Sequence, residues 1–369
     1  MKPSSSFITP EGEVPHWRTY IGEEEKLAVL QTIDNKSFSV GPATAEMEAE
    51  ISKALDVPYV LCTTSGSMAM VMGLMAAGIG PGDEVLVPTR TFIATAHAAS
   101  LLGAKVVLMD CLENNTSLDM ADAERKVTSR TKAIMPVHLN GRDCGMEALG
   151  EFSRKHNLFV VEDSCQSFLS RNSEGYLGTL GDVGCFSFGM VKLVNTGQGG
   201  AVVTRRKDLY DKLKCIRNHG VADVISHTYL SFGHNFKFND IQASIGIWQV
   251  KRGPDKAAHV NAINERYREG LEGMPFVHIL PVDTENGEVA MWTEVLCEDR
   301  DSLMNYLAGR GIQTRRFMPC VHTAPHYNVE ESFPNSERFD RMGFNLPGGP
   351  ALPLEYVDRT IGALKEYDH

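Results

Sequence analysis

The chain has 369 residues, of which 43% are apolar and 22% charged, and its formal net charge is −11. The length predicts about two domains, the composition is that of a soluble globular protein, and the negative charge argues against a nucleic-acid-binding protein. The longest apolar stretch, residues 67–80, is too short to cross a bilayer. We therefore expect neither a nucleic acid nor a membrane as a partner.

The first residues and the cysteines bear on the compartment. The start, MKPSSSFITPEGEVPHW, is polar and interrupted by proline, unlike a secretory signal. The eight cysteines never form a C-x-x-C pair. Reduced thiols in the cytoplasm are the default for such a chain, so we expect a cytoplasmic protein, and we predict no metal site.

Short β-rich runs alternate with helical segments between residues 58 and 204. The runs predict strands at 58–64, 83–88, 104–110, 132–139, 158–163, 184–188 and 200–204. Near-continuous apolar runs suit strands that are buried on both faces, so the pattern predicts an α/β protein with a mostly parallel sheet. The covering helices are expected at 68–78, 92–103 and 145–157, each closed by Gly or Asn.

A long helical stretch follows at residues 239–274, and Gly253-Pro254 interrupts it. The segments after it are typical of a smaller α+β domain, at 278–282, 290–298, 300–316 and 359–368. We therefore predict a large domain, 1–250, which includes an N-terminal arm, and a small C-terminal domain, 251–369.

Two strand ends offer features of a ligand site. The first predicted strand runs into Ser65-Gly66-Ser67, where a helix begins at once. Free amides and the helix dipole there suit a phosphate, although a serine that only caps the helix explains the same residues equally well. The next strand is followed by Phe92, which either packs in the core or stacks on a flat ring.

A third strand end carries a carboxylate. The predicted strand 158–163 ends in Glu162-Asp163, and Gln166 follows. A buried carboxylate needs a partner. The partner is either a structural one, in a salt bridge or helix cap, or a protonated pyridine nitrogen.

Lys192 lies between two apolar strands and is followed by Gly197, Gly199 and Gly200, which allow a sharp turn. It either extends to solvent or forms a Schiff base. An amine, a carboxylate, a phosphate cup and a stacking ring are together what pyridoxal 5′-phosphate requires. Ser187, five residues before Lys192, adds a hydroxyl for the phosphate. The joint order predicts a pyridoxal phosphate site.

The stretches TSGSMAM, VEDSCQS, GTLGDVGCFSFGMVK and TGQGGAVVT resemble the motifs of the DegT-type sugar aminotransferase family, from about residue 15 to the C-terminus. The resemblance implies a pyridoxal-phosphate-dependent transferase of fold type I. It also implies an aminotransferase that moves an amino group from an amino acid, usually glutamate, to a keto-sugar, which we expect to be nucleotide-linked, in amino-sugar biosynthesis. The cofactor would cycle through pyridoxamine 5′-phosphate.

The resemblance also implies residue roles. Lys192 would form the Schiff base, Asp163 would pair with the ring nitrogen, and Phe92 would stack on the ring. The remaining contacts would be Gln166 to the ring hydroxyl, Gly66, Ser67 and Ser187 to the phosphate, and Asn235 to the phosphate of the neighbouring subunit. The last contact implies a homodimer with shared active sites.

Substrate contacts are the least determined part. Arg90, Arg315, Arg316 and His322 occupy the expected substrate mouth, where they are either solvated or bind a carboxylate or a diphosphate. Lys237 stands where the family commonly has arginine. The sequence leaves the sugar, the nucleotide and the keto position open.

Three alternatives remain. A cyclitol aminotransferase and a pyridoxal-phosphate-dependent sugar dehydratase are variants within the family, although such dehydratases carry histidine at the position of Lys192. The third is a regulator that binds the cofactor without turnover, for which the sequence offers no output domain.

Overall fold

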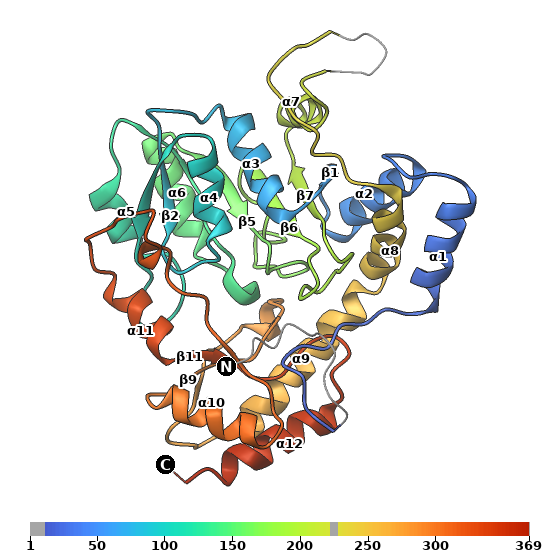
Figure 1. Cartoon of the computed structure of the whole chain (residues 1–369). Helices are drawn as coiled ribbons and strands as arrows, with labels where there is room; N and C mark the ends of the chain where they lie inside the picture. Colours follow the sequence, from blue (N-terminus) through green and yellow to red (C-terminus); the bar gives the residue numbers. More distant parts are fainter. Residues whose placement is uncertain (1–11, 222–227, 369) are drawn as a thin grey trace.

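The computed structural model describes residues 12–221 and 228–368, and a seven-stranded sheet lies at its centre (Figure 1). Its strand order is β1-β7-β6-β5-β4-β2-β3. Neighbouring strands are parallel from β6 to β3, whereas β7 runs antiparallel to both β6 and β1. The strands are β1 (Tyr59–Thr63), β2 (Glu84–Pro88), β3 (Lys105–Met109), β4 (Thr131–Ile134), β5 (Phe159–Asp163), β6 (Val183–Ser187) and β7 (Gly200–Thr204).

Helices cover both faces of this sheet. In β7, Val202 packs into the core beneath α3, whereas its neighbours Ala201 and Val203 pack against α2 and α8. This alternation explains why the strands read as continuous apolar runs. The covering helices are α2 (Pro42–Ala54), α3 (Gly66–Ala77), α4 (Ala94–Leu101), α5 (Met120–Lys126), α6 (Met146–His156), α7 (Lys207–Arg217) and α8 (Asp240–Lys251), with a short 3-10 helix at Leu139–Gly141. Helix α1 (Glu23–Asp34) packs against α8.

The predicted fold class, an α/β fold of type I, is confirmed. A strand lies within or beside each predicted strand range, and α3, α4 and α6 occupy the predicted helical segments. The predicted break in the long helical stretch is also present, because α8 ends at Lys251 and α9 (Gly253–Gly270) begins with proline in its first turn.

A second sheet, with the order β10-β11-β9-β8, is antiparallel throughout. Its core includes Tyr267 from α9, Leu303 from α10 and Phe344 from β11. In Figure 1, α9 runs from the main sheet towards this smaller unit. The elements are β8 (His278–Ile279), β9 (Glu294–Leu296), α10 (Arg300–Gly309), β10 (Arg315–Arg316), α11 (Pro334–Met342), β11 (Gly343–Asn345) and α12 (Leu354–Lys365), with 3-10 helices at Thr284–Asn286 and Val321–Thr323.

The chain crosses between the two units more than once. Val14 forms a bridge with Ile312 beside the small sheet, and Phe333 packs into the core under α3 and α4. The division at residue 250 therefore remains our proposal for the two domains, and residues 1–11 and 369 of that division lie outside the described residues.

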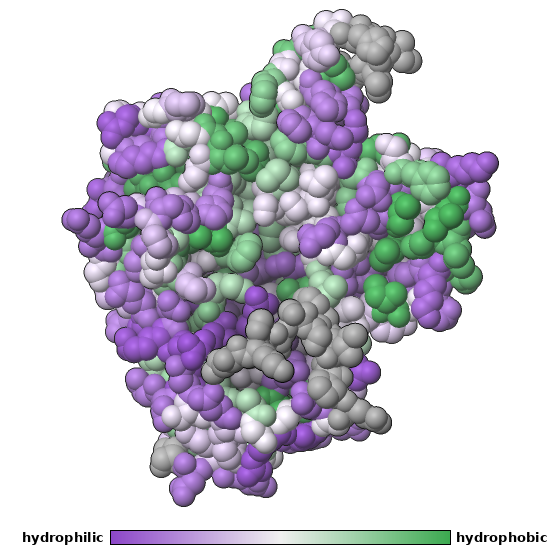
Figure 2. All heavy atoms as spheres, in the orientation of Figure 1, coloured by the Kyte–Doolittle hydropathy of each residue, from purple (hydrophilic) through white to green (hydrophobic). Residues whose placement is uncertain are grey.

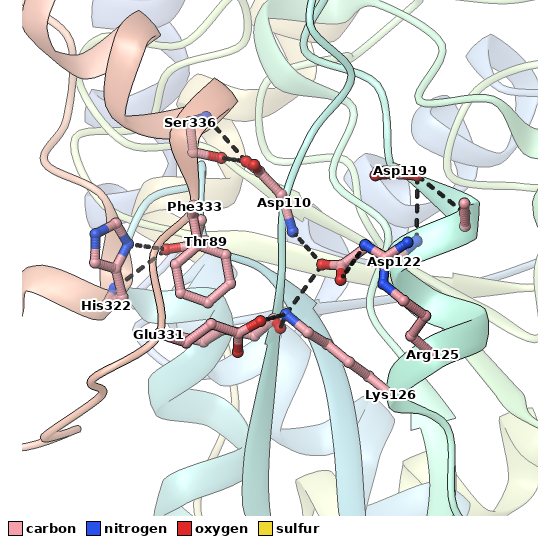
Figure 3. A network of polar contacts seen from close by, with 12 residues as sticks. Thr89, Asp110, Asp119, Asp122, Arg125, Lys126, His322, Glu331, Phe333 and Ser336 are labelled. Carbon is pink, nitrogen blue, oxygen red and sulfur yellow. Dashed lines mark hydrogen bonds and ion pairs between the residues drawn. The ribbon is translucent and has the colours of Figure 1, made fainter.

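The segment from Cys320 to Ser336 is held against the main sheet by the polar network of Figure 3. Asp110, just after β3, accepts hydrogen bonds from the backbone N–H groups of Asn335 (3.1 Å) and Ser336 (2.9 Å) at the start of α11. Lys126 forms an ion pair with Glu331 (2.7 Å). We call residues 320–336 the strap. The strap ties the start of α11 to the end of β3.

None of the helices in the described ranges combines the length and the apolar character that crossing a membrane requires. All eight cysteines are free thiols.

Candidate active site

A cavity of about 300 Å³ lies where the carboxyl ends of β1, β2, β5 and β6 meet the small sheet. This is the edge at which open α/β sheets bind ligands. The structure brings together at this cavity most of the residues singled out from the sequence, namely Gly66, Ser67, Arg90, Phe92, Asp163, Gln166, Ser187, Lys192, Arg315 and Arg316.

The start of α3 forms one wall. Ser65 caps the helix, because its hydroxyl accepts a hydrogen bond from the N–H of Met68 (3.2 Å). A Cβ on Gly66 would come within 2.7 Å of Cys165 Sγ and 2.8 Å of Ser187 Cβ. Only glycine therefore fits at position 66, where its N–H and that of Ser67 are among the groups at the helix start that lack a partner within the helix. The wall suits an anion such as a phosphate.

The adjacent carboxylates of Glu162 and Asp163, at the end of β5, lie in different surroundings. Glu162 is buried and accepts hydrogen bonds from the N–H groups of Gly178, Leu180 and Gly181, so it is a structural residue. Asp163 is also buried but lines the cavity, where Oδ2 accepts a hydrogen bond from Thr95 Oγ1 (2.6 Å). Asp163 forms no ion pair with a described cation, and Lys192 interacts with it only across the cavity, so the carboxylate is suited to a cationic ring nitrogen.

Lys192 lies on the loop between β6 and β7 and is partly buried. Burial lowers the pKa of Lys192, against the opposing effects of Cys165 and Asp163. Its Nζ lies 5.7 Å from the centre of the Trp292 ring. The loop turns at Gly197 and Gly199, whose φ angles of 80° and 153° favour glycine. The amine is therefore held close to Asp163 in a partly dehydrated site.

Gln166 and Phe92 complete the wall around this amine. Gln166 Oε1 accepts a hydrogen bond from the N–H of Asn140 (2.9 Å). The Asn140 side chain in turn bonds both the N–H (2.6 Å) and the carbonyl (2.7 Å) of Trp292, which joins the large sheet to the segment before β9. The Phe92 side chain is 49% exposed at the cavity edge, so a core-packing role does not account for it.

Three arginines line the cavity, one shortly after β2 and two in β10. Arg90 is buried, and its guanidinium lies over the Phe317 ring. Arg315 is partly buried, and burial lowers its pKa. Arg316 is exposed and forms an ion pair with Asp301 (2.7 Å). This wall is suited to anionic substrate groups.

Two of the residues singled out from the sequence do not line the cavity. His322 lies in the strap, where its Nδ1 is 2.8 Å from the Thr89 hydroxyl (Figure 3). Asn235 is exposed and pairs with Asn218 in a short bridge. Within one chain, therefore, neither residue reaches the cavity.

Sequence reasoning missed Thr95, Trp292 and Glu294, which contribute to this site. Thr95 was detectable, because it follows Phe92 by three residues and three-residue spacing places side chains on the same helix face. Trp292 and Glu294 belong to a segment that no motif marked.

A potential metal-ligand group lies outside the cavity. His138, Asp143 and Cys144 bring one ligand atom each within 4.8 Å of one another. The Asp143 carboxylate already accepts hydrogen bonds from Gly145, Met146 and Asn172. The absence of a metal site remains a prediction.

The model of the DegT/DnrJ/EryC1/StrS aminotransferase family matches residues 19–365. The chain belongs to this family. It is 33% identical to GDP-perosamine synthase from Escherichia coli O157:H7 over 358 residues, which cover 96% of this chain and 98% of that protein. It is also 33% identical to dTDP-3-amino-3,4,6-trideoxy-alpha-D-glucose transaminase from Streptomyces venezuelae over 350 residues, or 93% and 92% of the two chains.

Solved members of the family have the same fold. DesV from S. venezuelae, solved with a ketimine intermediate, superposes with a TM-score of 0.91 at 32% identity and covers 96% of this chain and 98% of its own. The sugar aminotransferase Spr1654 from Streptococcus pneumoniae, solved in a PLP form, has a TM-score of 0.89 at 25% identity, with 96% and 98% covered. The cofactor of this aminotransferase family is pyridoxal phosphate. Gly66 at the start of α3, Asp163 and Lys192 are residues that fit this cofactor.

Proposed function

We propose that this chain transfers the amino group of an amino acid, with glutamate as the donor, to a nucleotide-linked keto-sugar. The observation that carries the proposal is the meeting of Lys192, Asp163 and the start of α3 in one cavity, in a family whose relatives carry the names of GDP- and dTDP-sugar enzymes.

The residues divide the chemistry between them. Bound pyridoxal phosphate supplies an aldehyde that condenses with amines and a ring that accepts an electron pair from the donor's α-carbon. Lys192 would supply the amine that holds the cofactor and, as a free amine, the base that moves the α-proton of the donor. A lysine with a lowered pKa is more often the free amine, which is the form that both steps need.

The other residues hold the cofactor in place. Asp163 would keep the ring nitrogen protonated, since a neighbouring anion favours the charged form. Thr95 fixes one oxygen of that carboxylate. Gly66, Ser67 and Ser187 would receive the phosphate, Phe92 would cover the ring, and Gln166 would contact its hydroxyl.

We also propose that the working unit is a homodimer in which Asn235 enters the partner's site. Asn235 is exposed and lies outside the cavity of its own chain. Shortly before it, Tyr229, Leu230 and Phe232 are 78%, 62% and 79% exposed. Large apolar side chains that are this exposed are typical of an interface. The proposed location is the cytoplasm.

Helix α1 supports the same proposal. Leu27, Leu30 and Ile33 on this helix are 63%, 58% and 44% exposed. Figure 2 shows an apolar patch on the side of the molecule where Figure 1 draws α1. A second copy of the chain would remove this surface from water, which favours association.

The test follows the cofactor through both halves of the reaction. The enzyme loaded with pyridoxal phosphate is mixed with L-glutamate, and we expect the absorbance to change to that of the pyridoxamine form while 2-oxoglutarate appears. GDP- and dTDP-linked keto-sugars, free keto-sugars and keto-cyclitols are then added, and amino products are identified by mass spectrometry. Amination of only a keto-cyclitol would replace the sugar assignment. A protein that binds the cofactor but converts no amino acid would be a regulator rather than an aminotransferase.

A further inference from the structure

The guanidinium of Arg90 has unused donors. Its side chain is buried and lines the cavity, yet Nε and Nη2 have no hydrogen-bond partner among the described residues. The Phe317 and Phe339 ring centres lie 4.2 and 5.3 Å from its central carbon. The rings near the guanidinium do not provide the hydrogen-bond acceptors that its buried N–H groups require. The site is therefore built for a further acceptor.

Glu294 does not fill this need. The distance between Arg90 Nη2 and Glu294 Oε1 is 3.7 Å, which is beyond a hydrogen bond. The other oxygen of Glu294 bonds Arg142. Arg142 also donates to the carbonyls of Pro281 (2.7 Å) and Leu280 (3.1 Å). The Glu294 carboxylate is thus shared by Arg90 and Arg142. This group of two cations and one anion leaves one positive charge uncompensated at the cavity wall.

We propose that Arg90 binds a carboxylate of the amino donor. The proposal rests on the aminotransferase function above and names the residue that selects its first substrate. A carboxylate is planar and accepts two parallel N–H bonds from a guanidinium. Its single charge matches the one uncompensated charge of the group formed by Arg90, Arg142 and Glu294. A diphosphate would need further cations, which Arg315 and Arg316 on another part of the wall could supply.

Glu294 then acts as the alternative anion for Arg90 during the two half-reactions. The cavity must hold an anionic amino acid first and a sugar afterwards. In the first half-reaction, the donor's carboxylate takes the free donors of Arg90. In the second, Glu294 remains the anion nearest to Arg90 and limits the cost of a buried, unpaired charge. Glu294 is a positioning residue that competes with the donor.

Binding without turnover tests this directly. Glutarate, a dicarboxylate without an amine, is titrated into the enzyme loaded with pyridoxal phosphate, and the heat of binding is measured. Arg90→Met and Arg90→Lys should weaken glutarate binding by about tenfold or more, because a charge-assisted bidentate contact is lost or distorted. Glu294→Gln removes the competing anion and should strengthen it. Arg338→Lys is the matched control, since Arg338 also lies near the Phe339 ring but donates to the carbonyl of Glu113 outside the cavity.

The two half-reactions identify the source of the carboxylate. In Arg90→Lys, the glutamate concentration that gives half the maximal rate of pyridoxamine formation should rise at least about tenfold, and the effect on the reaction of the pyridoxamine form with keto-sugar should be much smaller. A loss confined to the second half-reaction would assign the carboxylate to the sugar and overturn the proposal. Unchanged glutarate binding in both Arg90 variants, with circular dichroism and cofactor absorbance as in the wild type, would overturn it as well. Because glutarate binding needs no catalysis, these results stand even if the chain proves inactive as an aminotransferase.

Discussion

Thr95 donates a 2.6 Å hydrogen bond to Asp163, and both side chains are buried. The hydroxyl oxygens of Thr95 and Thr91 are 2.9 Å apart. The Asp163 carboxylate is therefore anchored to the first turn of α4. The bond fixes the plane of the Asp163 carboxylate at the cavity wall. The position of that carboxylate therefore depends on a neighbour that no motif assigns to the cofactor.

The first prediction separates charge from position at Asp163. Asp163→Asn keeps the shape but removes the charge, and we expect proton abstraction from glutamate to slow by orders of magnitude, since about 1.4 kcal/mol is tenfold in rate. Thr95→Val should slow the same step by about tenfold, and Thr95→Ser, which keeps the hydroxyl, should restore it. Stopped-flow absorbance measures the step. Near-normal rates in Asp163→Asn would rule out its proposed role.

The second prediction concerns Lys192. Borohydride reduction of the loaded enzyme, followed by peptide mapping, should label this lysine, because a Schiff base is reduced to a stable secondary amine. Lys192→Ala should lose both the label and transamination while circular dichroism stays as in the wild type. Lys132→Ala serves as the control, since Lys132 lies outside the cavity and its Nζ donates to the carbonyl of Ser129 (3.3 Å). A label on a different lysine would transfer the assignment to that residue.

The third prediction addresses the shared site. Lys192→Ala and Asn235→Asp should each be inactive, the latter because a carboxylate would repel the cofactor phosphate. In a mixed dimer, one site carries both changes and the other carries neither. Mixing should therefore restore activity towards one working site per mixed dimer. Mixed dimers of verified mass that stay inactive would argue that Asn235 acts within its own chain, provided that Asn235→Asp alone loses cofactor.

The fourth prediction concerns acid stability. The hydrogen bond from Thr128 Oγ1, together with the donors of Arg130 and Lys105, lowers the pKa of Glu84 from 4.5 to about 2. The folded state thus favours the ionised form, so this stabilisation is complete above pH 4.5 and is lost as the pH falls towards 2. Denaturant unfolding between pH 6 and 3 should show a slope of at most about 1.4 kcal/mol per pH unit from this group. In Glu84→Gln the slope should be smaller, and an unchanged slope would exclude Glu84 as its source.

The fifth prediction tests the strap through Asp110. Asp110→Ala removes the acceptor at the start of α11 and should lower the free energy of unfolding by about 1–3 kcal/mol. It should also raise the substrate concentration for half-maximal rate, because α11 carries Phe339 beside Arg90. Asp119→Ala, which removes a cap from α5 in the same network (Figure 3), should cost stability without affecting substrate binding. Equal effects on substrate binding in both variants would show that the strap has no specific role in substrate binding.

The main sheet was predictable because its strands are buried on both faces, so that runs such as that of β2 carry no polar interruption after Glu84. The cavity residues from the main sheet and its loops were predictable because most lie at or shortly after a strand end, and parallel strands bring their carboxyl ends to one edge. Helix α1 gave no comparable signal, because Leu27 and Leu30 are exposed rather than buried in the described chain.

The residues that the small sheet and its neighbouring segments contribute to the site were harder to predict. Arg315 was singled out, but the partners of Arg90 were not, because Glu294 and Phe317 follow it by more than 200 residues and only folding brings them together. Histidine in a loop also gave an ambiguous signal. His322 was expected at the substrate mouth, whereas it bonds Thr89 and secures the strap.

The strap also sets the order in which the molecule is completed during synthesis. Asp110 bonds Ser336, 226 residues further along the chain, and Phe317 and Phe339 reach Arg90 over a similar separation. A nascent chain on the ribosome can assemble the main sheet well before these residues emerge, because domains form largely as units from the N-terminal end. During that interval Arg90 is exposed to water and the cavity has no second wall. The complete cavity, and with it the proposed contact between Arg90 and the donor, can therefore form only after residues 317–339 have left the ribosome.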